Sequence, residues 1–200
     1  MWVVKLGGSL DAARALRVWV NALADSLTPL IICPGGGGFA DAVRDAQSRW
    51  AFDDRTAHRM AILGMEQTAH LLCGLRPDLA PVSDSSRFDI SPEGRRQAVW
   101  FPSAELLNDA GLPHSWNVTS DSLAAILARR IGAEGLALVK SSTVPDAPLH
   151  ARHCSDLLDS AFHCYGSACG CPVWLLSGTE PDGFERLVRR GDAACQICFD

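Results

Sequence analysis

The sequence has no long apolar run and no block of like charges. Its longest apolar stretches, near Leu30 and Val173, fall far short of the roughly 18 residues that a membrane-spanning helix needs. The formal net charge is −5, and the clustered basic residues of a nucleic-acid-binding protein are missing. We therefore expect neither nucleic acid nor a membrane as a partner. Met1 leads directly into a strand-like segment without the pattern of a signal peptide, which favours a cytoplasmic location.

Strong metal-binding patterns are also missing. The chain has eight cysteines, but without an export signal their thiols should stay reduced, and we interpret them first as small buried apolar residues. Histidines and cysteines crowd residues 150–171, and Cys195 and Cys198 form a single Cys-x-x-Cys pair. A structural zinc site usually needs two such pairs, and side chains three positions apart on a strand face opposite ways. We therefore assign no metal ligands.

The apolar content, 48% over 200 residues, is sufficient for one compact domain covering residues 1–200. Short segments typical of strands alternate with longer amphipathic segments typical of helices. The expected strands are residues 2–6, 30–33, 98–101, 136–140, 172–177 and 194–199, and the expected helices are residues 11–27, 39–48, 53–74, 104–109, 119–131, 155–168 and 181–190. Residues 83–97 are polar and turn-prone, which indicates a loop. The alternation predicts an α/β fold with a mainly parallel open sheet covered by helices on both faces.

Lysine is nearly absent, since the chain has only Lys5 and Lys140 against 16 arginines. Each of these lysines ends an apolar strand-like segment. In an open α/β sheet, ligands bind outside the carboxyl ends of the strands, and a compact ammonium group suits a phosphoryl oxygen. We interpret both lysines as candidate catalytic residues. The alternative is that each simply reaches water from the end of a strand.

Two glycine-rich turns follow the first two expected strands. Glycine lets backbone N–H groups approach a phosphate closely, and the N-terminus of a following helix adds partial positive charge. The candidate phosphate-binding residues of these turns are Gly7, Gly8, Ser9, Gly35, Gly36, Gly37 and Gly38. The alternatives are two tight strand-to-helix turns or, for residues 35–40, the G-x-G-x-x-A pattern of dinucleotide-binding folds. That pattern is weakened because Asp53 and Asp54, about 20 positions on, follow no evident strand.

A third element is the segment from Asn117 to Asp121, which enters the expected helix 119–131. Asp121 could orient the two lysines, and Asn117 could bind a nucleotide or a metal-linked phosphate. The alternative for Asp121 is simple stabilisation of the helix dipole. Thr119 or Ser120 is expected to cap this helix, and Gly132 is expected to end it.

With these elements in chain order, the sequence resembles the amino acid kinase superfamily. The matching features are a lysine and Gly-Gly-Ser after the first strand, a glycine-rich second turn, and an asparagine followed four residues later by an aspartate before a helix. Residues 56–65 and 112–122 look like segments of the branch that includes the archaeal aminomethylfuran phosphate kinases of methanofuran biosynthesis.

The resemblance implies a three-layer α/β/α sandwich, with ATP over the C-terminal half of the sheet and a small phosphorylated acceptor over the N-terminal half. It implies that Lys5 stabilises the transferred phosphoryl group, that Asp121 positions Lys5, and that Lys140 supplies a second positive charge. The further residues assigned to the nucleotide are Asn117, Thr119, Ser120 and Ser141, and those assigned to the acceptor are Arg55 and His58. ATP and Mg²⁺ are the expected cofactors, and a homo-oligomer is the expected assembly.

The expected activity is therefore transfer of the γ-phosphoryl group of ATP to a phosphorylated acceptor. The best candidate acceptor is aminomethylfuran phosphate, which would place the enzyme in methanofuran-type cofactor biosynthesis and one-carbon metabolism. One alternative is a uridylate-kinase-like enzyme, and another is a non-catalytic small-molecule- or metal-binding protein with the same fold. The alternative for His58 is a simple polar contact from a helix face. Other arginines that could clamp an acceptor phosphate are Arg59, Arg87, Arg95 and Arg96.

Overall fold

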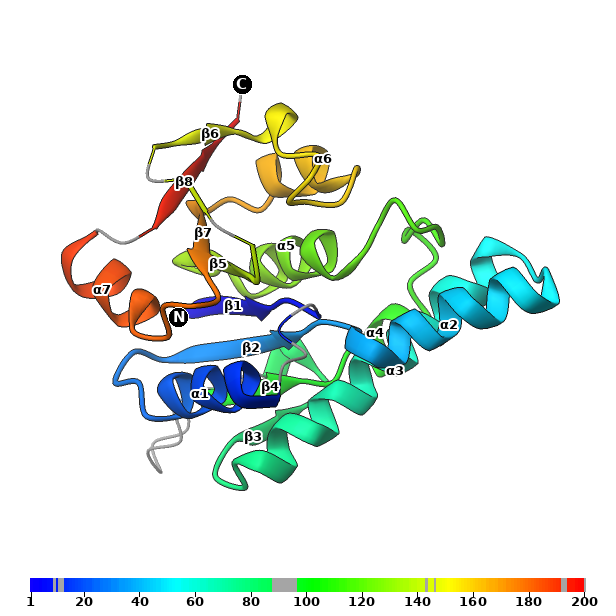
Figure 1. Cartoon of the computed structure of the whole chain (residues 1–200), viewed down its shortest axis with the longest axis horizontal. Coiled ribbons are helices and arrows are strands. Elements are labelled where there is room, and N and C mark those ends of the chain that lie inside the picture. The colour runs from blue at the N-terminus through cyan, green and yellow to red at the C-terminus, as the bar shows by residue number, and fades with distance from the viewer. Residues whose placement is uncertain are drawn as a thin grey trace.

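The computed structural model describes residues 1–8, 10, 13–87, 97–142, 144–145, 147–191 and 194–199. An eight-stranded sheet runs through the molecule in the order β3-β4-β2-β1-β5-β7-β8-β6 (Figure 1). Its strands are β1 (Trp2–Leu6), β2 (Leu30–Pro34), β3 (Ala80–Val82), β4 (Gln97–Trp100), β5 (Gly135–Lys140), β6 (Leu149–His150), β7 (Val173–Ser177) and β8 (Cys195–Cys198). The strand pairs are parallel except β7 with β8, which is antiparallel. The expected α/β class with a mainly parallel open sheet is confirmed.

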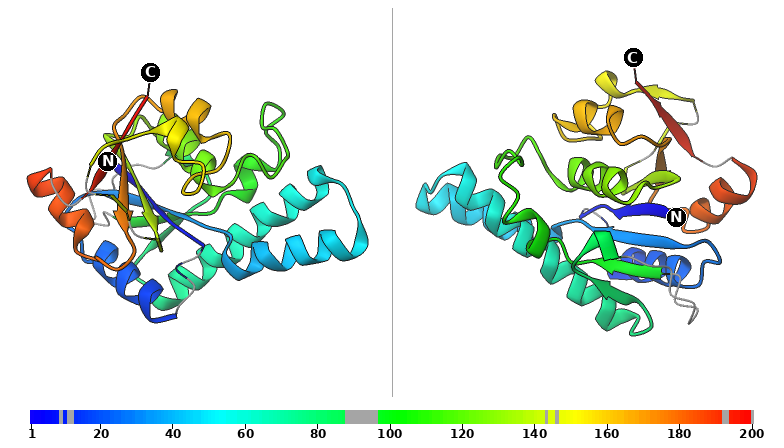
Figure 2. Two further views of the ribbon diagram at one scale, coloured as in Figure 1. Left: turned by 45° about the horizontal axis from the view of Figure 1, so that its top comes forward. Right: turned by 180° about the vertical axis from the view of Figure 1, so that it is seen from behind.

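Helices cover both faces of this sheet (Figures 1 and 2). The α-helices are α1 (Ala13–Ala24), α2 (Gly37–Trp50), α3 (Asp54–Leu75), α4 (Ser103–Leu106), α5 (Ser120–Ile131), α6 (Phe162–Ser167) and α7 (Gly183–Arg190), and the short 3₁₀ turns are η1 (Ser85–Arg87) and η2 (Ala151–His153). One apolar core joins the sheet to α5 and α6, and a second joins it to α1, α7 and the C-terminal half of α3. Within the described residues, no helix is long and apolar enough to cross a membrane.

The structure corrects several expected boundaries. The short strands β3 and β6 were not predicted, because three and two residues are too few to show an alternating pattern. The helix expected over 155–168 begins only at Phe162, since the preceding residues form turns that contact the start of α5. Of the loop expected over 83–97, residues 88–96 lie outside the described part of the chain.

The register of the central strands brings the two lysines to one face. Lys5 of β1 pairs with Leu138 of β5, and Lys140 follows two positions later on that strand. Because side chains alternate along a strand, Lys140 lies on the same face as Leu138. Val3 and Leu138 belong to the core beneath α5. Both lysines therefore point to the α5 side at the carboxyl ends of neighbouring strands.

Helices α2 and α3 form a hairpin that extends beyond the sheet (Figure 2). Ala51 ends α2 in the left-handed conformation, with φ at 53°, and the side chain of Asp53 caps α3 by accepting from the N–H of Thr56 at 2.7 Å. At the base of the hairpin, a Cβ on Gly64 would lie 3.3 Å from the backbone nitrogen of Ala40. This close approach fixes the two helices at the carboxyl edge of the sheet.

Candidate active site

Two buried ammonium groups share one buried carboxylate at the carboxyl edge of the sheet. The Nζ of Lys5 lies 2.7 Å from Oδ1 of Asp121, and the Nζ of Lys140 lies 2.6 Å from Oδ2. The exposed fractions of Lys5, Asp121 and Lys140 are only 4%, 4% and 8%. Lys5 is the penultimate residue of β1, Lys140 ends β5, and Asp121 lies in the first turn of α5. The structure thus brings the three predicted catalytic residues together, and the alternative of lysines that reach water separately is wrong.

The charges of this cluster shift one another's pKa values. Burial and the nearby charge of Lys5 together lower the pKa of Lys140 to about 8, although Asp121 opposes the shift. Burial alone would raise the pKa of Asp121, but the charges of Lys5 and Lys140 outweigh burial and hold the pKa below its ordinary value. The three groups carry two positive charges and one negative charge when all are ionised. A net positive site near water-exposed glycine turns can bind a phosphoryl group.

The two glycine turns pack against each other beside the lysines. A Cβ on Gly8 would lie 2.6 Å from the nitrogen of Gly37, and a Cβ on Gly35 would lie 2.5 Å from the nitrogen of Gly8. The N–H of Gly35 donates to the carbonyl of Leu6 at 2.9 Å. Only glycine fits positions 8 and 35, because any side chain there would meet backbone.

The predicted phosphate-binding residues fall into two groups within these turns. The N–H groups of Gly7 and Gly35 are used within the fold, since Gly7 donates to the carbonyl of Val139 at 3.2 Å. Gly36 and Gly37 lie at the N-terminus of α2, where backbone N–H groups have no partner within the helix. Ser9 lies outside the described residues. The first turn of α2 is therefore the part of the glycine motif best suited to an anion.

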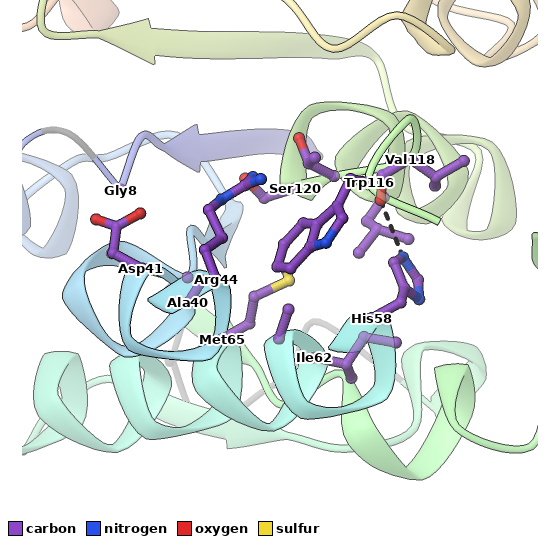
Figure 3. Close-up of a pocket in the computed structure, with 15 residues that line it drawn as sticks. Gly8, Ala40, Asp41, Arg44, His58, Ile62, Met65, Trp116, Val118 and Ser120 are labelled. Atoms are coloured by element: carbon purple, nitrogen blue, oxygen red, sulfur yellow. Dashed lines mark hydrogen bonds between the residues drawn. The ribbon is translucent and has the colours of Figure 1, made fainter. Parts of the chain in front are cut away.

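A cavity of about 230 Å³ opens from the glycine turns toward α3 (Figure 3). Its floor is apolar and includes Ile62 and Met65 of α3. Polar side chains stand around this floor, including Asp41, Arg44 and His58. The residues that line the cavity are Gly8, Gly36, Gly37, Ala40, Asp41, Arg44, His58, Ala61, Ile62, Met65, Trp116, Val118, Thr119, Ser120 and Leu123. Such a cavity, with an apolar floor and a few polar groups, is suited to a small organic phosphate.

His58 is buried at one end of this cavity and uses both ring nitrogens. Its Nε2 lies 2.9 Å from the carbonyl oxygen of Val118, and its Nδ1 lies 3.1 Å from Nδ1 of His114. Burial and the neighbouring His114 lower the pKa of His58, although the contact with Val118 opposes the shift. A neutral ring that donates from Nε2 to Val118 leaves Nδ1 to accept from His114. The polar contact considered for His58 is present, and the residue also lines the cavity.

Arg44 and Trp116 form a wall of the cavity that the sequence analysis missed. The guanidinium carbon of Arg44 lies 3.8 Å from the centroid of the Trp116 ring, and the indole Nε1 of Trp116 donates to Oε1 of Gln47 at 2.6 Å. Ala40, Arg44 and Gln47 recur at helical spacing on α2, and this pattern could have identified the face. Arg44 is the arginine whose side chain borders this cavity.

The arginines proposed from sequence lie elsewhere. Arg55 borders a separate depression with Asp109 and His114, and Arg59 donates to the carbonyl of Leu107 at 2.8 Å. Arg87 belongs to η1. Arg95 and Arg96 lie outside the described residues. The structure therefore does not bring Arg55 into the cavity that holds His58.

The first turn of α5 is capped from a distant part of the chain, which corrects the expected cap. Thr119 is the N-cap residue but its own side chain makes no capping hydrogen bond. Instead, Oδ2 of Asp159 accepts from the N–H of Thr119 at 2.9 Å and from the N–H of Ser122 at 3.0 Å. Ser120 borders the cavity without serving as the cap. Gly132 ends the helix with φ at 60°, as predicted.

The other residues assigned to the nucleotide lie on the same edge. Asn117 is exposed, and its Oδ1 accepts from the hydroxyl of Ser160 at 3.1 Å. Ser141 is exposed directly after Lys140. A second cavity of about 210 Å³ lies nearby, at the carboxyl end of β7, and its lining residues include Val144, Pro145, Leu175 and Ser177.

Metal ligands do not converge in the part of the chain that the structure describes. There, no group of three or more histidine, cysteine, aspartate or glutamate side chains could hold a metal ion. Cys195 is buried and Cys198 exposed, so this pair faces opposite ways. Asp121, the buried carboxylate beside the glycine turns, is already paired with two lysines. These donors do not form a dedicated Mg²⁺ site, whereas the lysines and the first turn of α2 fit the phosphates of a nucleotide.

Sequence comparison identifies one curated relative with a kinase name. Over 133 residues, the chain is 31% identical to the [5-(aminomethyl)furan-3-yl]methyl phosphate kinase of Methanocaldococcus jannaschii. The match covers 64% of this chain and spans 60% of the relative's length. No protein-family model matches the sequence.

Structure comparison finds proteins of the same fold over nearly the whole chain. The uridylate kinase of Archaeoglobus fulgidus has a TM-score of 0.73 and 18% identity, covering 98% of this chain and 99% of its own. The UMP kinase of Bacillus anthracis has a TM-score of 0.75 and 15% identity, covering 100% of this chain and 96% of its own. The isopentenyl phosphate kinase of T. acidophilum has a TM-score of 0.58 and 14% identity, covering 99% and 100%. Together with the sequence match, these likenesses confirm the predicted amino acid kinase-like fold and the resemblance to the aminomethylfuran phosphate kinase branch.

Proposed function

We propose that this protein is a small-molecule kinase that transfers the γ-phosphoryl group of ATP to a phosphorylated acceptor. The observation that carries the proposal is the convergence of Lys5 and Lys140 on Asp121 beside two interlocked glycine turns. Phosphoryl transfer requires little covalent chemistry from a protein, so position and charge supply most of the rate. The cluster offers both.

Each group of the site has a distinct role in this reaction. The ammonium groups of Lys5 and Lys140 stabilise negative charge on the phosphoryl group as it moves. Asp121 holds both ammonium groups in place. The N–H groups at the start of α2 orient phosphate oxygens at the point where the two ligands meet. Mg²⁺ would arrive bound to the nucleotide phosphates and supply further positive charge there.

The acceptor is proposed to occupy the 230 Å³ cavity between α2, α3 and the loop before α5. Its phosphate would lie near Gly8 and Arg44, and its organic part would lie over Ile62 and Met65. Arg44 is held over the ring of Trp116, and a guanidinium fixed in this way suits a phosphate. This assignment replaces Arg55 as the acceptor's arginine.

The aminomethylfuran phosphate is the proposed acceptor because the M. jannaschii relative is named for that substrate. A furan ring with two short substituents is compact and flat, which suits an apolar floor bordered by an indole. Asp41, which also lines the cavity, could pair with an ammonium group. The nucleotide is proposed to lie on the other side of the lysines, with its base in the cavity at the end of β7.

A coupled assay of ADP release tests this proposal. ATP and Mg²⁺ are supplied with [5-(aminomethyl)furan-3-yl]methyl phosphate, UMP or isopentenyl phosphate, and we expect the highest kcat/KM with the first. Replacing Lys5 with alanine is expected to lower kcat by about 10² or more, because it removes a charge that acts in the transition state. Arg129→Ala, at an exposed position on the last turn of α5, serves as the control.

Two outcomes would contradict the proposal. Full activity in Lys5→Ala would show that Lys5 takes no part in phosphoryl transfer. Absence of both ADP release and any calorimetric signal with millimolar ATP and Mg²⁺ would instead favour a binding protein that has the fold but no kinase activity. Preference for UMP would retain the kinase and change only its acceptor.

A further inference from the structure

Asp159 lies far from the catalytic residues in sequence but contacts the first turn of α5. Its Oδ2 accepts from the N–H and the hydroxyl of Thr119, both at 2.9 Å, and from the N–H of Ser122 at 3.0 Å. Its Oδ1 accepts from the hydroxyl of Ser122 at 2.5 Å. Four hydrogen bonds thus end on one carboxylate at the positive end of a helix, where a negative charge is favourable.

The residues after Asp159 hold the same loop at a second point. The hydroxyl of Ser160 donates to Oδ1 of Asn117 at 3.1 Å, and the N–H of Ala161 donates to the carbonyl of Asn117 at 3.0 Å. Residues 159–161 therefore form hydrogen bonds with residues 117–122 on both sides of Val118. This contact joins the part of the chain that follows β5 to the wall of the acceptor cavity.

Asp121 lies between the two residues that Asp159 holds. Thr119 and Ser122 flank it, and Thr119 has no capping hydrogen bond from its own side chain. To meet both ammonium groups at 2.7 Å and 2.6 Å, Asp121 must present its two oxygens in one orientation. A shift of about 1 Å in such a group can cost a large factor in rate.

The charge of Asp159 also acts on the cluster directly. Burial and Lys5 lower the pKa of Lys140, and the negative charges of Asp121 and Asp159 oppose that shift. Protonated Lys140 is the form that can stabilise phosphoryl charge. Asp159 thus favours protonated Lys140 and also fixes the orientation of Asp121, with which Lys140 is paired.

We propose that Asp159 is a positioning residue for phosphoryl transfer. It fixes the first turn of α5 and so keeps the carboxylate of Asp121 oriented toward the ammonium groups of Lys5 and Lys140. The catalytic consequence rests on the kinase function proposed above. The effect of Asp159 on the protonation of Lys140 does not depend on that function, since the titration of Lys140 can be measured without any turnover.

The scarcity of lysine makes that measurement direct. Protein labelled with ¹³C at lysine Cε gives signals from only Lys5 and Lys140, and Lys140→Arg assigns them. We expect Asp159→Asn to lower the measured pKa of Lys140. Asp53→Asn is the matched control, because Asp53 caps α3 in a similar way but is exposed. This control should leave both lysine titrations unchanged.

Kinetics provide the second readout. We expect Asp159→Ala to lower kcat by about tenfold or more while KM for ATP changes less than threefold. In Asp159→Asn, the fall of kcat at alkaline pH should begin at a lower pH than in the native enzyme, because Lys140 loses its proton earlier. Asp53→Asn should show neither effect, because asparagine caps a helix about as well as aspartate.

The outcomes separate the two proposals. An unchanged Lys140 titration together with an unchanged kcat, in an Asp159→Asn protein that folds, would make Asp159 an ordinary helix cap and overturn the inference. An inactive native protein would contradict the kinase function. In that case, a shifted Lys140 titration in Asp159→Asn would still support the positioning role.

Discussion

At the scale of single residues, one carboxylate serves two ammonium groups inside the protein. Asp121 is 4% exposed and lies within 2.7 Å of both lysines. Removing one member of a buried ion cluster leaves charge without compensation, which is costly. The arrangement that we propose for binding a phosphoryl group therefore also makes the fold sensitive to Asp121.

We expect Asp121→Asn to reduce the free energy of unfolding by about 3 kcal/mol at pH 7. The cost should become smaller as pH rises toward 8, because Asp121 no longer raises the pKa of Lys140 in this variant, and loss of the Lys140 proton relieves the repulsion between the two lysines. Urea denaturation at pH 6 and pH 9 measures the difference. An equal loss at both pH values would contradict the idea that repulsion between the lysines causes it.

His58 should give the stability of the folded protein a different dependence on pH. Its pKa is lower in the folded protein than in the unfolded chain, so the unfolded chain binds more protons below pH 6.5. Stability should therefore fall as pH drops below about 6.5, down to the pKa of the folded state. Thermal unfolding from pH 7.5 to 5 should show a shallower decline for His58→Gln than for the native protein. His153→Gln, at an exposed position, is the control. An equally shallow decline of stability in His153→Gln would show that the pH dependence does not arise from His58.

At the scale of elements, the two glycine turns act as one unit because their backbones touch. A Cβ on Gly8 would approach the nitrogen of Gly37 to 2.6 Å and its Cα to 2.9 Å. The backbone of the second turn cannot move away from such a Cβ unless the two turns separate. We therefore expect the turns to tolerate no side chain at Gly8.

Gly8→Ala is expected to lower kcat by about tenfold or more, because it displaces the start of α2 from the lysines. Gly74→Ala provides the matched control, since no atom beyond its chain neighbours and the adjacent backbone of its own helix lies within 4 Å of an added Cβ. Near the end of α3, that substitution should be neutral or stabilising by up to about 1 kcal/mol. Kinetics and thermal unfolding of both variants test the expectation, and normal activity in Gly8→Ala would show that the turns can separate without consequence.

The sequence predicted these elements because their signals are local. A lysine at the end of an apolar strand, or glycines after it, can be identified within ten residues. The cap of α5 could not be predicted in this way, because Asp159 is 37 positions from Ser122. Arg44 was also missed, since the partner that fixes it, Trp116, belongs to another segment. The short edge strands β3 and β6 carry too few residues for any periodic pattern.

At the scale of the whole molecule, the helical hairpin presents an exposed apolar stripe. Met60, Leu63 and Leu71 of α3 are 37%, 46% and 43% exposed, and Phe39 of α2 is 42% exposed. Met65 and Leu72 are instead buried in the core. Part of the apolar set on this helix thus fills the core, and the remainder is available for contact.

We expect a second copy of the chain to bind at this stripe. Light scattering of the native protein should then give a mass above 21.5 kDa, and Leu63→Glu should lower it toward that value, because a charge in an apolar contact is unfavourable. Arg129→Glu, at an exposed position on α5 away from the hairpin, is the control. A native mass of 21.5 kDa would contradict the expected homo-oligomer.

The near absence of lysine has a practical consequence for this protein. The side-chain amines of Lys5 and Lys140, the two lysines of the sequence, are both enclosed within the site. Acylating reagents that label most proteins over their whole surface therefore have few targets here. The rate at which such a reagent modifies the two lysines would report how often the site opens to solvent, and protection by a bound nucleotide would make the same reagent a probe of occupancy.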